Sequence, residues 1–506
     1  MAPVPGALVI AGGGTLPAEA RSEFVRLAGG KGKAKIVVIP TASADADDLA
    51  KYESFTKPWE EAGAASVALV HATKGLADNP AVLVPLKEAT GVWFSGDQTR
   101  LTKAYRGTAV EAEVQKVLAR GGVVGGTSAG AAVMSDLMIE GGNPTAKVGP
   151  GFGFLPGVVV DQHFTQRKRI DRLRGVLDTN PGTVGLGIDE GTAVIVTRGR
   201  LLKVVGEGTV TACWARSASR PAAEEVVKAG GTFDLFQLRR AAAARAAKEP
   251  FPPVSPADPV VPKGALVIVG GGGLPNEVVE RFIELAGGKD APLIVVPTAQ
   301  DDPLAADHPE ARLFKRHGMA DVTVLHTRDR KLVDDPEFSK PLLKAKAVWF
   351  GGGRQWRFVD AYEGTLTERR FREVLARGGV IGGSSAGASI QSEYMPRGHP
   401  LGNTVVMAEG YERGFGYLPG AAVDQHFFAR KRTGDMEKLM AAYPKLLGVG
   451  IDEGTAVVVA GSTAEVIGKS KVAFFDWRAG RPDGSAWTEV PSGRRYDLKA
   501  RALIDP

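Results

Sequence analysis

Two short stretches of this chain place a serine where a nucleophile is needed. Gly126-Thr-Ser-Ala-Gly130 and Gly383-Ser-Ser-Ala-Gly387 each follow a run of valine or isoleucine. Both fit Gly-x-Ser-x-Gly, the nucleophile elbow, in which a strand ends, turns sharply at the serine and enters a helix. The helix N-terminus offers free N–H groups to an oxyanion. The pattern therefore predicts Ser128 and Ser385 as nucleophiles, with plain packing of small residues as the alternative.

A serine hydroxyl needs a base, and the base needs a group that orients it. His163 and His426 each stand in the sequence Asp-Gln-His-Phe, after an apolar run. We expect both at the carboxyl ends of strands, on the same edge as the serines. His71 and His326 also follow strands, but no polar residues that recur between the copies flank them, so the first pair is favoured.

Carboxylates suited to the orienting role recur as well. Glu190 and Glu453 lie at the same distance after their histidines, each in Gly-Ile-Asp-Glu-Gly-Thr-Ala. Asp189, Asp452 and Glu140 are the rival acids. The alternative for all of them is a turn or helix cap.

Glycine-rich loops leave two further strands, in Phe94-Ser-Gly-Asp-Gln98 and Phe350-Gly-Gly-Gly-Arg-Gln355. An ordinary glycine turn is the alternative to an oxyanion loop. The expected oxyanion donors are the backbone N–H groups of Gly96, Ala129, Gly352 and Ala386. The expected substrate-binding amides are Gln98 and Gln355. The glycines after the first strand of each copy lack the G-x-G-x-x-G spacing, so they indicate close backbone approach and no nucleotide site.

Basic residues follow each histidine: Arg167, Lys168, Arg169 and Arg172 in one copy, Arg430, Lys431 and Arg432 in the other. A helix that begins at Thr165 would place Arg169 and Arg172 on one face. Guanidinium groups suit a carboxylate-bearing substrate, and a solvated helix face is the alternative. The second copy has Asp435 where the first has Arg172.

These motifs recur because the chain is a tandem repeat. Its 506 residues form two copies, at residues 1–249 and 263–506, joined by a proline-rich extended linker at 250–262. Continuous Val/Ile strands alternate with helices, which predicts an α/β fold with a mostly parallel sheet covered on both faces. Expected strands are 7–11, 35–39, 66–70, 91–94, 122–125, 158–160 and 193–196. Expected helices are 17–28, 47–62, 102–119, 129–137 and 165–178, with a further helical stretch at 238–248.

Composition limits the remaining classes. The net charge of +6 is mild for this length and no Lys/Arg block stands out, so we expect no nucleic-acid partner. The single cysteine, Cys213, rules out an intramolecular disulfide, and no metal site or cofactor is indicated. The start of the chain has no signal-peptide pattern and no run approaches a membrane span, so we expect a cytoplasmic protein without a membrane partner.

The two elbows, the two Gly/Gln loops, Asp-Gln-His-Phe and Gly-Ile-Asp-Glu together resemble the cyanophycinase branch of the S51 serine peptidases, along nearly all of each copy. The resemblance implies two three-layer α/β/α domains of the class I glutamine-amidotransferase-like type. It implies a Ser-His-Glu triad in each copy: Ser128, His163 and Glu190, then Ser385, His426 and Glu453. It implies a substrate pocket from Gln98, Asp161, Gln162, Arg167, Arg169 and Arg172, and in the second copy Gln355, Asp424, Gln425, Arg430 and Arg432.

The function so implied is a serine-type peptidase of β-aspartyl peptides. The expected substrate is cyanophycin, a poly-Asp chain with Arg on its side chains, which is cleaved to β-Asp-Arg dipeptides. The alternatives are an aspartyl dipeptidase-like exopeptidase, an amidotransferase-like activity on small molecules, or one active copy beside a non-catalytic binding copy. Asp435 makes the second copy the candidate binder. Family members pair as dimers, so one chain supplying both halves and a homodimer are both open.

Overall fold

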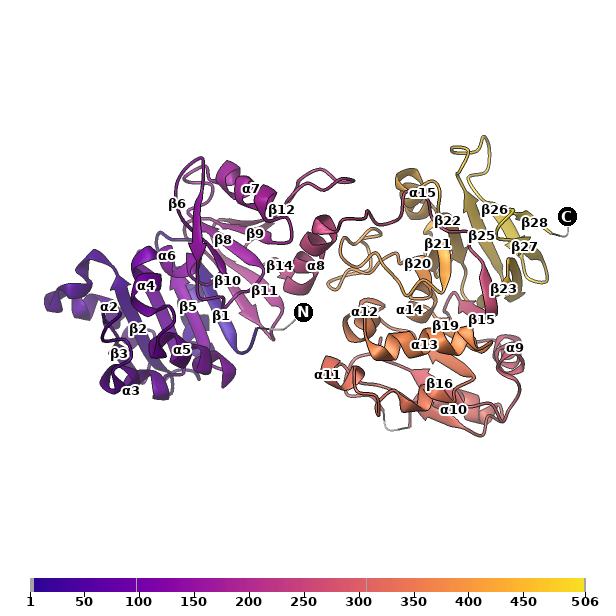
Figure 1. Ribbon diagram of the computed structural model, residues 1–506, viewed down its shortest axis with the longest axis horizontal. Coiled ribbons are helices and arrows are strands. Elements are labelled where there is room, and N and C mark those ends of the chain that lie inside the picture. The colour runs from indigo at the N-terminus through magenta and orange to yellow at the C-terminus, as the bar shows by residue number, and fades with distance from the viewer. Residues whose placement is uncertain (1–3, 97, 306, 505–506) are drawn as a thin grey trace. The chain divides into compact units, whose positions relative to one another are not determined.

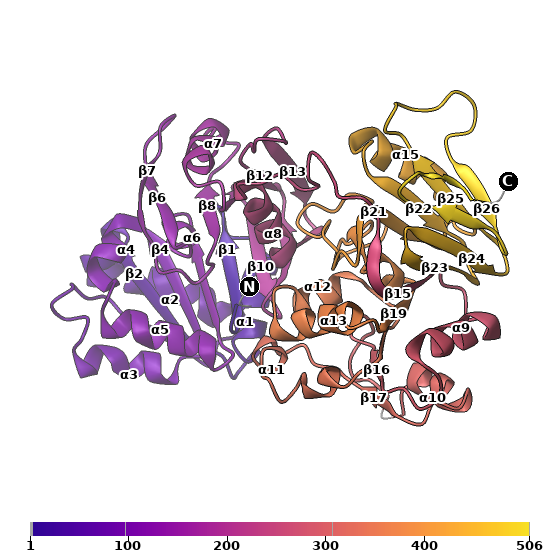
Figure 2. The same cartoon turned by 45° about the vertical axis from the view of Figure 1, so that its right-hand side comes forward.

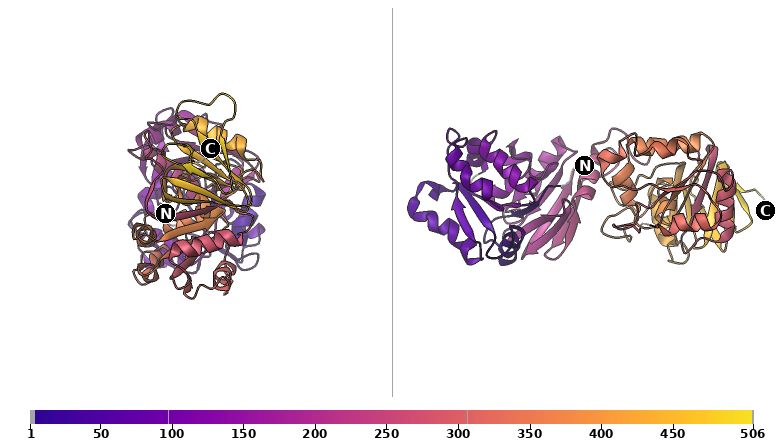
Figure 3. Two further views of the ribbon diagram at one scale, coloured as in Figure 1. Left: turned by 90° about the vertical axis from the view of Figure 1, so that its right-hand side faces the viewer. Right: turned by 90° about the horizontal axis from the view of Figure 1, so that it is seen from below.

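The computed structural model describes residues 4–96, 98–305 and 307–504. It divides into two compact units, Met1–Lys248 and Glu249–Pro506. The colour gradient separates them, indigo to magenta for the first and red to yellow for the second (Figure 1). Figure 3 shows strands and helices of each unit from two further sides. Most of the predicted linker has no regular structure, and its last residues begin a strand at Val261. Phe251 of this segment stacks on Tyr394, with 5.9 Å between the ring centroids.

The first unit contains these strands: β1 (Ala7–Ala11), β2 (Lys35–Ala42), β3 (Ser66–Leu69), β4 (Gly91–Gly96), β5 (Val123–Thr127), β6 (Leu137–Gly141), β7 (Lys147–Pro150), β8 (Val158–Gln162), β9 (Val184–Ile188), β10 (Thr192–Thr197), β11 (Leu201–Gly206), β12 (Thr209–Trp214), β13 (Ala223–Lys228) and β14 (Thr232–Asp234). Its helices are α1 (Ala18–Leu27), η1 (Ala44–Asp47), η2 (Leu49–Lys51), α2 (Tyr52–Glu61), α3 (Pro80–Glu88), α4 (Gln98–Tyr105), α5 (Ala109–Ala119), α6 (Ala129–Ala132), α7 (Ile170–Thr179) and α8 (Leu235–Ala246).

The second unit contains these strands: β15 (Val261–Val269), β16 (Leu293–Val296), β17 (Val322–Val324), β18 (Ala347–Phe350), β19 (Val380–Ser384), β20 (Ser392–Tyr394), β21 (Leu418–Gln425), β22 (Leu447–Ile451), β23 (Thr455–Gly461), β24 (Thr463–Gly468), β25 (Lys471–Asp476), β26 (Thr488–Pro491), β27 (Arg495–Asp497) and β28 (Ala502–Leu503). Its helices are α9 (Asn276–Ala286), α10 (Pro309–Arg316), α11 (Arg330–Val333), η3 (Lys340–Leu343), α12 (Trp356–Tyr362), α13 (Leu366–Ala376), α14 (Ala386–Ser389) and α15 (Thr433–Ala442).

Each unit has a large mixed sheet and a smaller second sheet. The large sheets run β14-β11-β10-β1-β5-β4-β2-β3 and β17-β16-β18-β19-β15-β23-β24-β27-β28. Strands β1 to β5 pair in parallel, and β10, β11 and β14 extend the first sheet antiparallel. The smaller sheets are β13-β12-β9-β8 and β20-β21-β22-β25-β26. The predicted α/β class and tandem arrangement are confirmed.

Both faces of the large sheet are covered. Successive side chains of a strand point to opposite faces. In β1, Leu8 and Ile10 join one core cluster while Ala7 and Val9 join another. Val114 of α5 belongs to the first cluster and Trp59 of α2 to the second, so these two helices, both labelled in Figure 2, cover opposite faces of the sheet. In the second unit, Leu266 and Ile268 of β15 join one cluster while Ala265 and Val267 join another, so each unit is a three-layer α/β/α structure.

Several predicted helices differ from those observed. The predicted helix 102–119 is two helices, divided at Gly107, whose φ is +75°. The predicted helix 129–137 stops after Ala132, because the carbonyls of Val133 and Met134 accept hydrogen bonds from Phe152 and Leu155 and not from a continuing helix. The predicted helix 47–62 begins only at Tyr52, because two 3₁₀ turns, Ala44–Asp47 and Leu49–Lys51, precede α2.

The helix after His163 begins at Ile170, five residues later than predicted. Lys168 has a φ of +50°, which breaks helical geometry. The Asp189 carboxylate accepts the N–H of Thr165 and holds the intervening turn. The predicted helix 238–248 is confirmed as α8, which begins earlier, at Leu235. None of the helices within the described ranges combines the length and apolar character that a membrane crossing requires.

Candidate active site

The carboxyl end of β1 holds the three segments that carry the serine, the histidine and the glutamate. Successive carbonyls of Ala11, Gly12 and Gly13 accept the N–H groups of Ser128, His163 and Gly191, at 3.0, 2.7 and 3.0 Å. In the second unit, Val269, Gly270 and Gly271 accept those of Ser385, His426 and Gly454 in the same order, at 3.0, 2.7 and 2.7 Å. One strand end therefore places all three segments, although they come from two different sheets.

The glycines at this strand end leave room for the site. A Cβ on Gly13 would lie 2.2 Å from the His163 ring, and one on Gly271 would lie 2.2 Å from the His426 ring. The interpretation of these glycines as close-approach positions is confirmed. The histidines themselves have φ of +48° and +52°, a region that costs a non-glycine residue free energy. The close packing around the strand end maintains this conformation.

The serines sit in the strained turn of a nucleophile elbow. Ser128 has φ 52° and ψ −111°, and Ser385 has φ 55° and ψ −109°. A Cβ on Gly126 would lie 2.3 Å from the Gly130 carbonyl oxygen, and a Cβ on Gly130 would lie 2.2 Å from the Phe94 carbonyl oxygen, so both glycines of the motif are sterically required. Such strain is typical of functional sites.

The three side chains form a continuous hydrogen-bonded chain in each unit. Ser128 Oγ lies 2.8 Å from His163 Nε2, and His163 Nδ1 lies 2.5 Å from Glu190 Oε1. In the second unit, the distances are 2.9 Å from Ser385 Oγ to His426 Nε2 and 2.6 Å from His426 Nδ1 to Glu453 Oε1. This arrangement has the geometry of a nucleophile, a general base and an orienting acid.

The rival acids point elsewhere. Asp189 accepts hydrogen bonds from the N–H groups of Thr165 and Thr209. Asp452 accepts them from Ala429 N and Ser470 Oγ. Glu140 pairs with Lys147 at 3.2 Å.

The electrostatics keep the histidines neutral. Burial lowers the pKa of His163, and the charge of Arg167 lowers it further, while Glu190 opposes both. Burial also lowers the pKa of His426, where Arg430 acts in the same direction and Glu453 against it. A neutral imidazole at pH 7 can accept the serine proton, as a general base must.

The oxyanion loops differ between the units and correct one expectation. Cβ atoms on Gly96 and Gly353 would meet the equivalent segments Ala42–Ser43 and Ala299–Gln300, so Gly353 is the counterpart of Gly96. The extra residue of the second loop therefore precedes Gly353. The N–H of Gly352 donates to Glu310 Oε1 at 3.3 Å. The expectation of a free Gly352 donor is wrong in this structure, because the amide already has an acceptor. Ala129 and Ala386 begin the short helices that follow the serines, and their role as oxyanion donors stays a prediction.

Several residues expected to bind substrate form a buried ion cluster. The carboxylate of Asp161 is fully buried and accepts Arg172 Nε at 2.8 Å, and Arg169 lies beside it at 3.4 Å. In the second unit Asp424 is buried against Arg432 at 2.9 Å. The expectation that Asp161, Arg172, Asp424 and Arg432 face the substrate is corrected, since their charges satisfy one another inside the protein.

The expected glutamines are also inside. Gln355 donates to the carbonyls of Pro396 and Arg397, at 2.8 and 2.9 Å. Gln425 accepts from Ser389 Oγ, and Gln162 is buried. The side chain of Gln98 lies outside the described residues. Arg167 and Arg430 remain exposed, next to the histidines whose pKa they lower.

Arg397 is the charged residue that sequence reasoning missed. Its guanidinium binds Asp424 at 3.1 Å and Asp435 at 2.8 Å, so it replaces the guanidinium that Arg172 supplies in the first unit. Arg397 and Glu140 are as far apart in the chain as the two serines, so the copies exchange Glu140 and Arg172 for Arg397 and Asp435. This double exchange was the signal in the sequence that could have identified Arg397 as the replacement for Arg172.

The Asp161 cluster leads to a stability prediction. Asp161→Asn leaves the buried Arg172 without its countercharge, which we expect to cost about 3–5 kcal/mol of the first unit's free energy of unfolding. Differential scanning calorimetry should show the melting temperature of that unit falling by roughly 6–20 °C. Asp171→Ala, at an exposed carboxylate on α7, is the control and should change little. A shift no larger than the control's would contradict the assignment.

His71 and His326 have more partners than expected. His71 bonds Thr41 Oγ1 at 3.0 Å and Asp47 at 2.9 Å; His326 bonds Thr298 Oγ1 at 2.9 Å and Asp302 at 3.0 Å. The threonines in turn bond Tyr105 and Tyr362. The residues that flank these histidines in the sequence gave no sign of these partners, because the partners lie on other segments.

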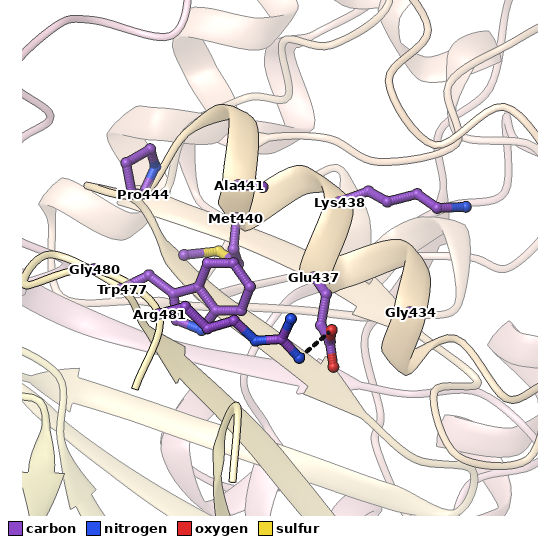
Figure 4. Close-up of a pocket in the computed structure, with 9 residues that line it drawn as sticks. All are labelled: Gly434, Glu437, Lys438, Met440, Ala441, Pro444, Trp477, Gly480 and Arg481. Atoms are coloured by element: carbon purple, nitrogen blue, oxygen red, sulfur yellow. Dashed lines mark hydrogen bonds and ion pairs between the residues drawn. The ribbon is translucent and has the colours of Figure 1, made fainter. Parts of the chain in front are cut away.

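A surface pocket of the second unit lies apart from these residues (Figure 4). It opens between α15 and the segment after β25, where Trp477, Met440 and Arg481 line it. Arg481 pairs with Glu437 at 2.9 Å. No serine, histidine or glutamate of either triad arrangement contributes to its lining.

Comparison with known proteins identifies the family to which the chain belongs. The model of peptidase family S51 matches residues 8–204 and 266–467. The cyanophycinase of Geminocystis herdmanii is 33% identical over 207 residues, covering 40% of this chain and 76% of that protein. The cyanophycinase of a Nostoc species is 34% identical over 232 residues, covering 43% and 75%. A crystal structure of a peptidase from an acI-B1 actinobacterium covers 46% of this chain and 97% of its own, at 22% identity and a TM-score of 0.35. The two family matches span most of the sequence, and the chain is therefore a peptidase that belongs to family S51.

Proposed function

We propose that both units hydrolyse peptide bonds with a Ser-His-Glu triad and that the substrate is cyanophycin. The observation that carries the triad is the hydrogen-bonded chain from Ser128 through His163 to Glu190, repeated within 0.1 Å in the second unit. The repetition supports two working sites over one active and one binding copy. The likeness to proteins named cyanophycinase supports the substrate.

The proposed reaction follows the roles of the three groups. Ser128 Oγ attacks the carbonyl carbon while His163 Nε2 takes its proton, and Glu190 holds the imidazolium that forms. His163 then gives the proton to the leaving nitrogen, the amine departs, and an acyl-enzyme ester remains. Water, deprotonated by the same histidine, hydrolyses the ester and frees the serine. Ser385, His426 and Glu453 act identically in the second unit.

The charge of the polymer fits the exposed part of the site. Cyanophycin carries a carboxylate on the side-chain arginine of each repeat, and a guanidinium fork binds a carboxylate in a fixed geometry. The exposed Arg167 and Arg430 stand beside the histidines and are suited to that contact. Release of β-Asp-Arg leaves the side-chain linkage intact, so the bonds cut are the main-chain bonds of the poly-Asp backbone.

The substrate proposal is tested by offering polymer and dipeptide separately. The full chain is incubated with purified cyanophycin and with β-Asp-Arg, and the products are separated by liquid chromatography and mass spectrometry. We expect soluble β-Asp-Arg from the polymer and no cleavage of the dipeptide. The Ser128→Ala/Ser385→Ala variant is the control and should release nothing. Cleavage of the dipeptide alone would replace the proposal with a dipeptidase.

A further inference from the structure

A carboxylate lies behind the oxyanion loop of the second unit. Glu310, near the start of α10, accepts the Gly352 N–H. A Cβ on Gly352 would lie 3.7 Å from the Ser385 Cβ, so this amide is adjacent to the nucleophile. A Cβ on Gly351 would lie 2.4 Å from Glu310 Oε2, so only glycine leaves room for the carboxylate there. The loop and Glu310 are thus fitted to each other.

Within the described residues of the first unit, the position equivalent to Glu310 holds no carboxylate. Trp59 packs against Phe24 and Trp93 as Phe314 packs against Phe282 and Trp349, which aligns α2 with α10. One helical turn earlier stand Phe55 in the first unit and Glu310 in the second. Phe55 packs against the hydrophobic core. The loop after β4 in the first unit is also one residue shorter than the loop after β18 in the second.

The surroundings of Glu310 are poor in charge. His308, the N-cap of α10, lies 4.0 Å from Oε2, and burial lowers the pKa of this histidine. The Trp349 indole lies near the carboxylate without completing a hydrogen bond. Apolar side chains of the same core cluster as α10 come from α9, β16 and β17: Phe282, Val295 and Val322.

The nearby arginines do not offset the negative charge. Arg354 directs its guanidinium to the carbonyls of His399 and Gly402, and Arg357 pairs with Asp301. Burial raises the pKa of Glu310 to about 7, and the Gly352 amide only partly opposes this. The carboxyl group therefore changes its charge close to neutral pH.

We propose that Glu310 is a positioning residue that, while ionised, holds the Gly352 amide away from the reacting carbonyl and so slows the second unit relative to the first. An oxyanion hole needs donors aimed at the oxygen on which negative charge develops. A donor engaged by a carboxylate is not aimed there, and a carboxylate near the loop also disfavours the oxyanion. Protonation weakens the hold, because a neutral acceptor binds an N–H roughly half as strongly. The inference rests on the triad function proposed above.

The test isolates Ser385 in the full chain. In a Ser128→Ala background, an alkyl fluorophosphonate is used to label Ser385: Oγ forms a bond to phosphorus, fluoride leaves, and His426 takes the proton. The labelling rate and kcat on cyanophycin are measured from about pH 6 to about pH 9. We expect Glu310→Gln to raise the labelling rate and kcat by about tenfold at the alkaline end of this range and to leave both nearly unchanged at the acid end. Tenfold is a part of the roughly 10²–10³-fold in kcat that one oxyanion donor contributes. Gln has the size and hydrogen-bonding capacity of the protonated acid, so folding should be retained.

Two controls accompany the variant. Glu373→Gln removes an exposed carboxylate on α13 of the same unit and should leave the profile unchanged. Glu310→Gln in a Ser385→Ala background should leave the first unit's profile unchanged. Coinciding profiles for Glu310→Gln and its parent, or an equal loss at every pH, would overturn the inference while leaving the triad in place. Failure of every variant to label Ser385 would remove the proposed function of this unit and the inference with it.

Discussion

Replacement of Ser128 and Ser385 together by alanine is expected to lower hydrolysis by on the order of 10⁶-fold, because each site loses the atom that forms the acyl-enzyme. The single variants should each retain the turnover of the other unit, since each serine has its own histidine at 2.8 or 2.9 Å. Initial rates of product release from cyanophycin, with equal protein concentrations, provide the measurement. Alanine fits the elbow sterically, because each serine already places a Cβ there at the same positive φ.

The same set of variants distinguishes two working sites from one. Thr127→Ala, next to the nucleophile, is the matched control and should retain most activity. If one single variant lost all turnover and the other lost none, the unit whose serine could be replaced without loss would be a binding copy. Turnover by the double variant would contradict the serine mechanism for this chain.

Glu190→Gln and Glu453→Gln are expected to lower kcat of their own unit by about 10⁴-fold, the effect of the corresponding change in a serine triad. The glutamate accepts the proton on Nδ1 of the histidine, so Nε2 is free to accept the serine proton. A glutamine can donate to Nδ1 through its amide, which favours the tautomer that carries its proton on Nε2. That tautomer cannot act as the base.

Each glutamate variant is measured with the other unit silenced by Ser→Ala. Glu61→Gln and Glu373→Gln are the controls, at exposed residues of the first and second units. We expect kcat to fall with KM nearly unchanged, because the glutamate acts on the histidine and not on the substrate. A loss below about tenfold would show that neither glutamate orients its histidine.

Local pattern was enough for much of the site. The elbow around Ser128 could be predicted because its glycines are sterically required, since a Cβ on Gly126 or on Gly130 would clash with backbone atoms. Recurrence of the flanking motif favoured His163 over His71, but Asp189 recurs as Asp452 and was separated from Glu190 only by the resemblance and then by the hydrogen bonds of the fold. The geometry agrees in both units because the same residues meet the same strand end.

Positions that depend on distant segments were less predictable. His163 was expected on the same sheet edge as Ser128, but it follows β8 of the smaller sheet. Its backbone N–H donates to the Gly12 carbonyl at the end of β1, which places its ring beside the serine. Arg172 reads as a free guanidinium beside the site, and only the fold shows its partner Asp161. The polar partners of His71 were missed for the same reason, since Asp47 and Thr41 lie on other elements.

The sequence alone determined the α/β class, the tandem repeat and which serine, histidine and glutamate recur together, because these depend on periodicity and on short motifs whose backbone geometry is local. Only the tertiary structure decided which charged side chains satisfy one another internally and which remain exposed. In the second unit Arg397, which comes from a different segment than Arg172 does in the first, pairs with the buried Asp424. Glu310 accepts the N–H of Gly352, which lies 42 residues further along the chain. Such pairings depend on how buried charges find partners in the folded core, which the spacing within a single copy does not encode.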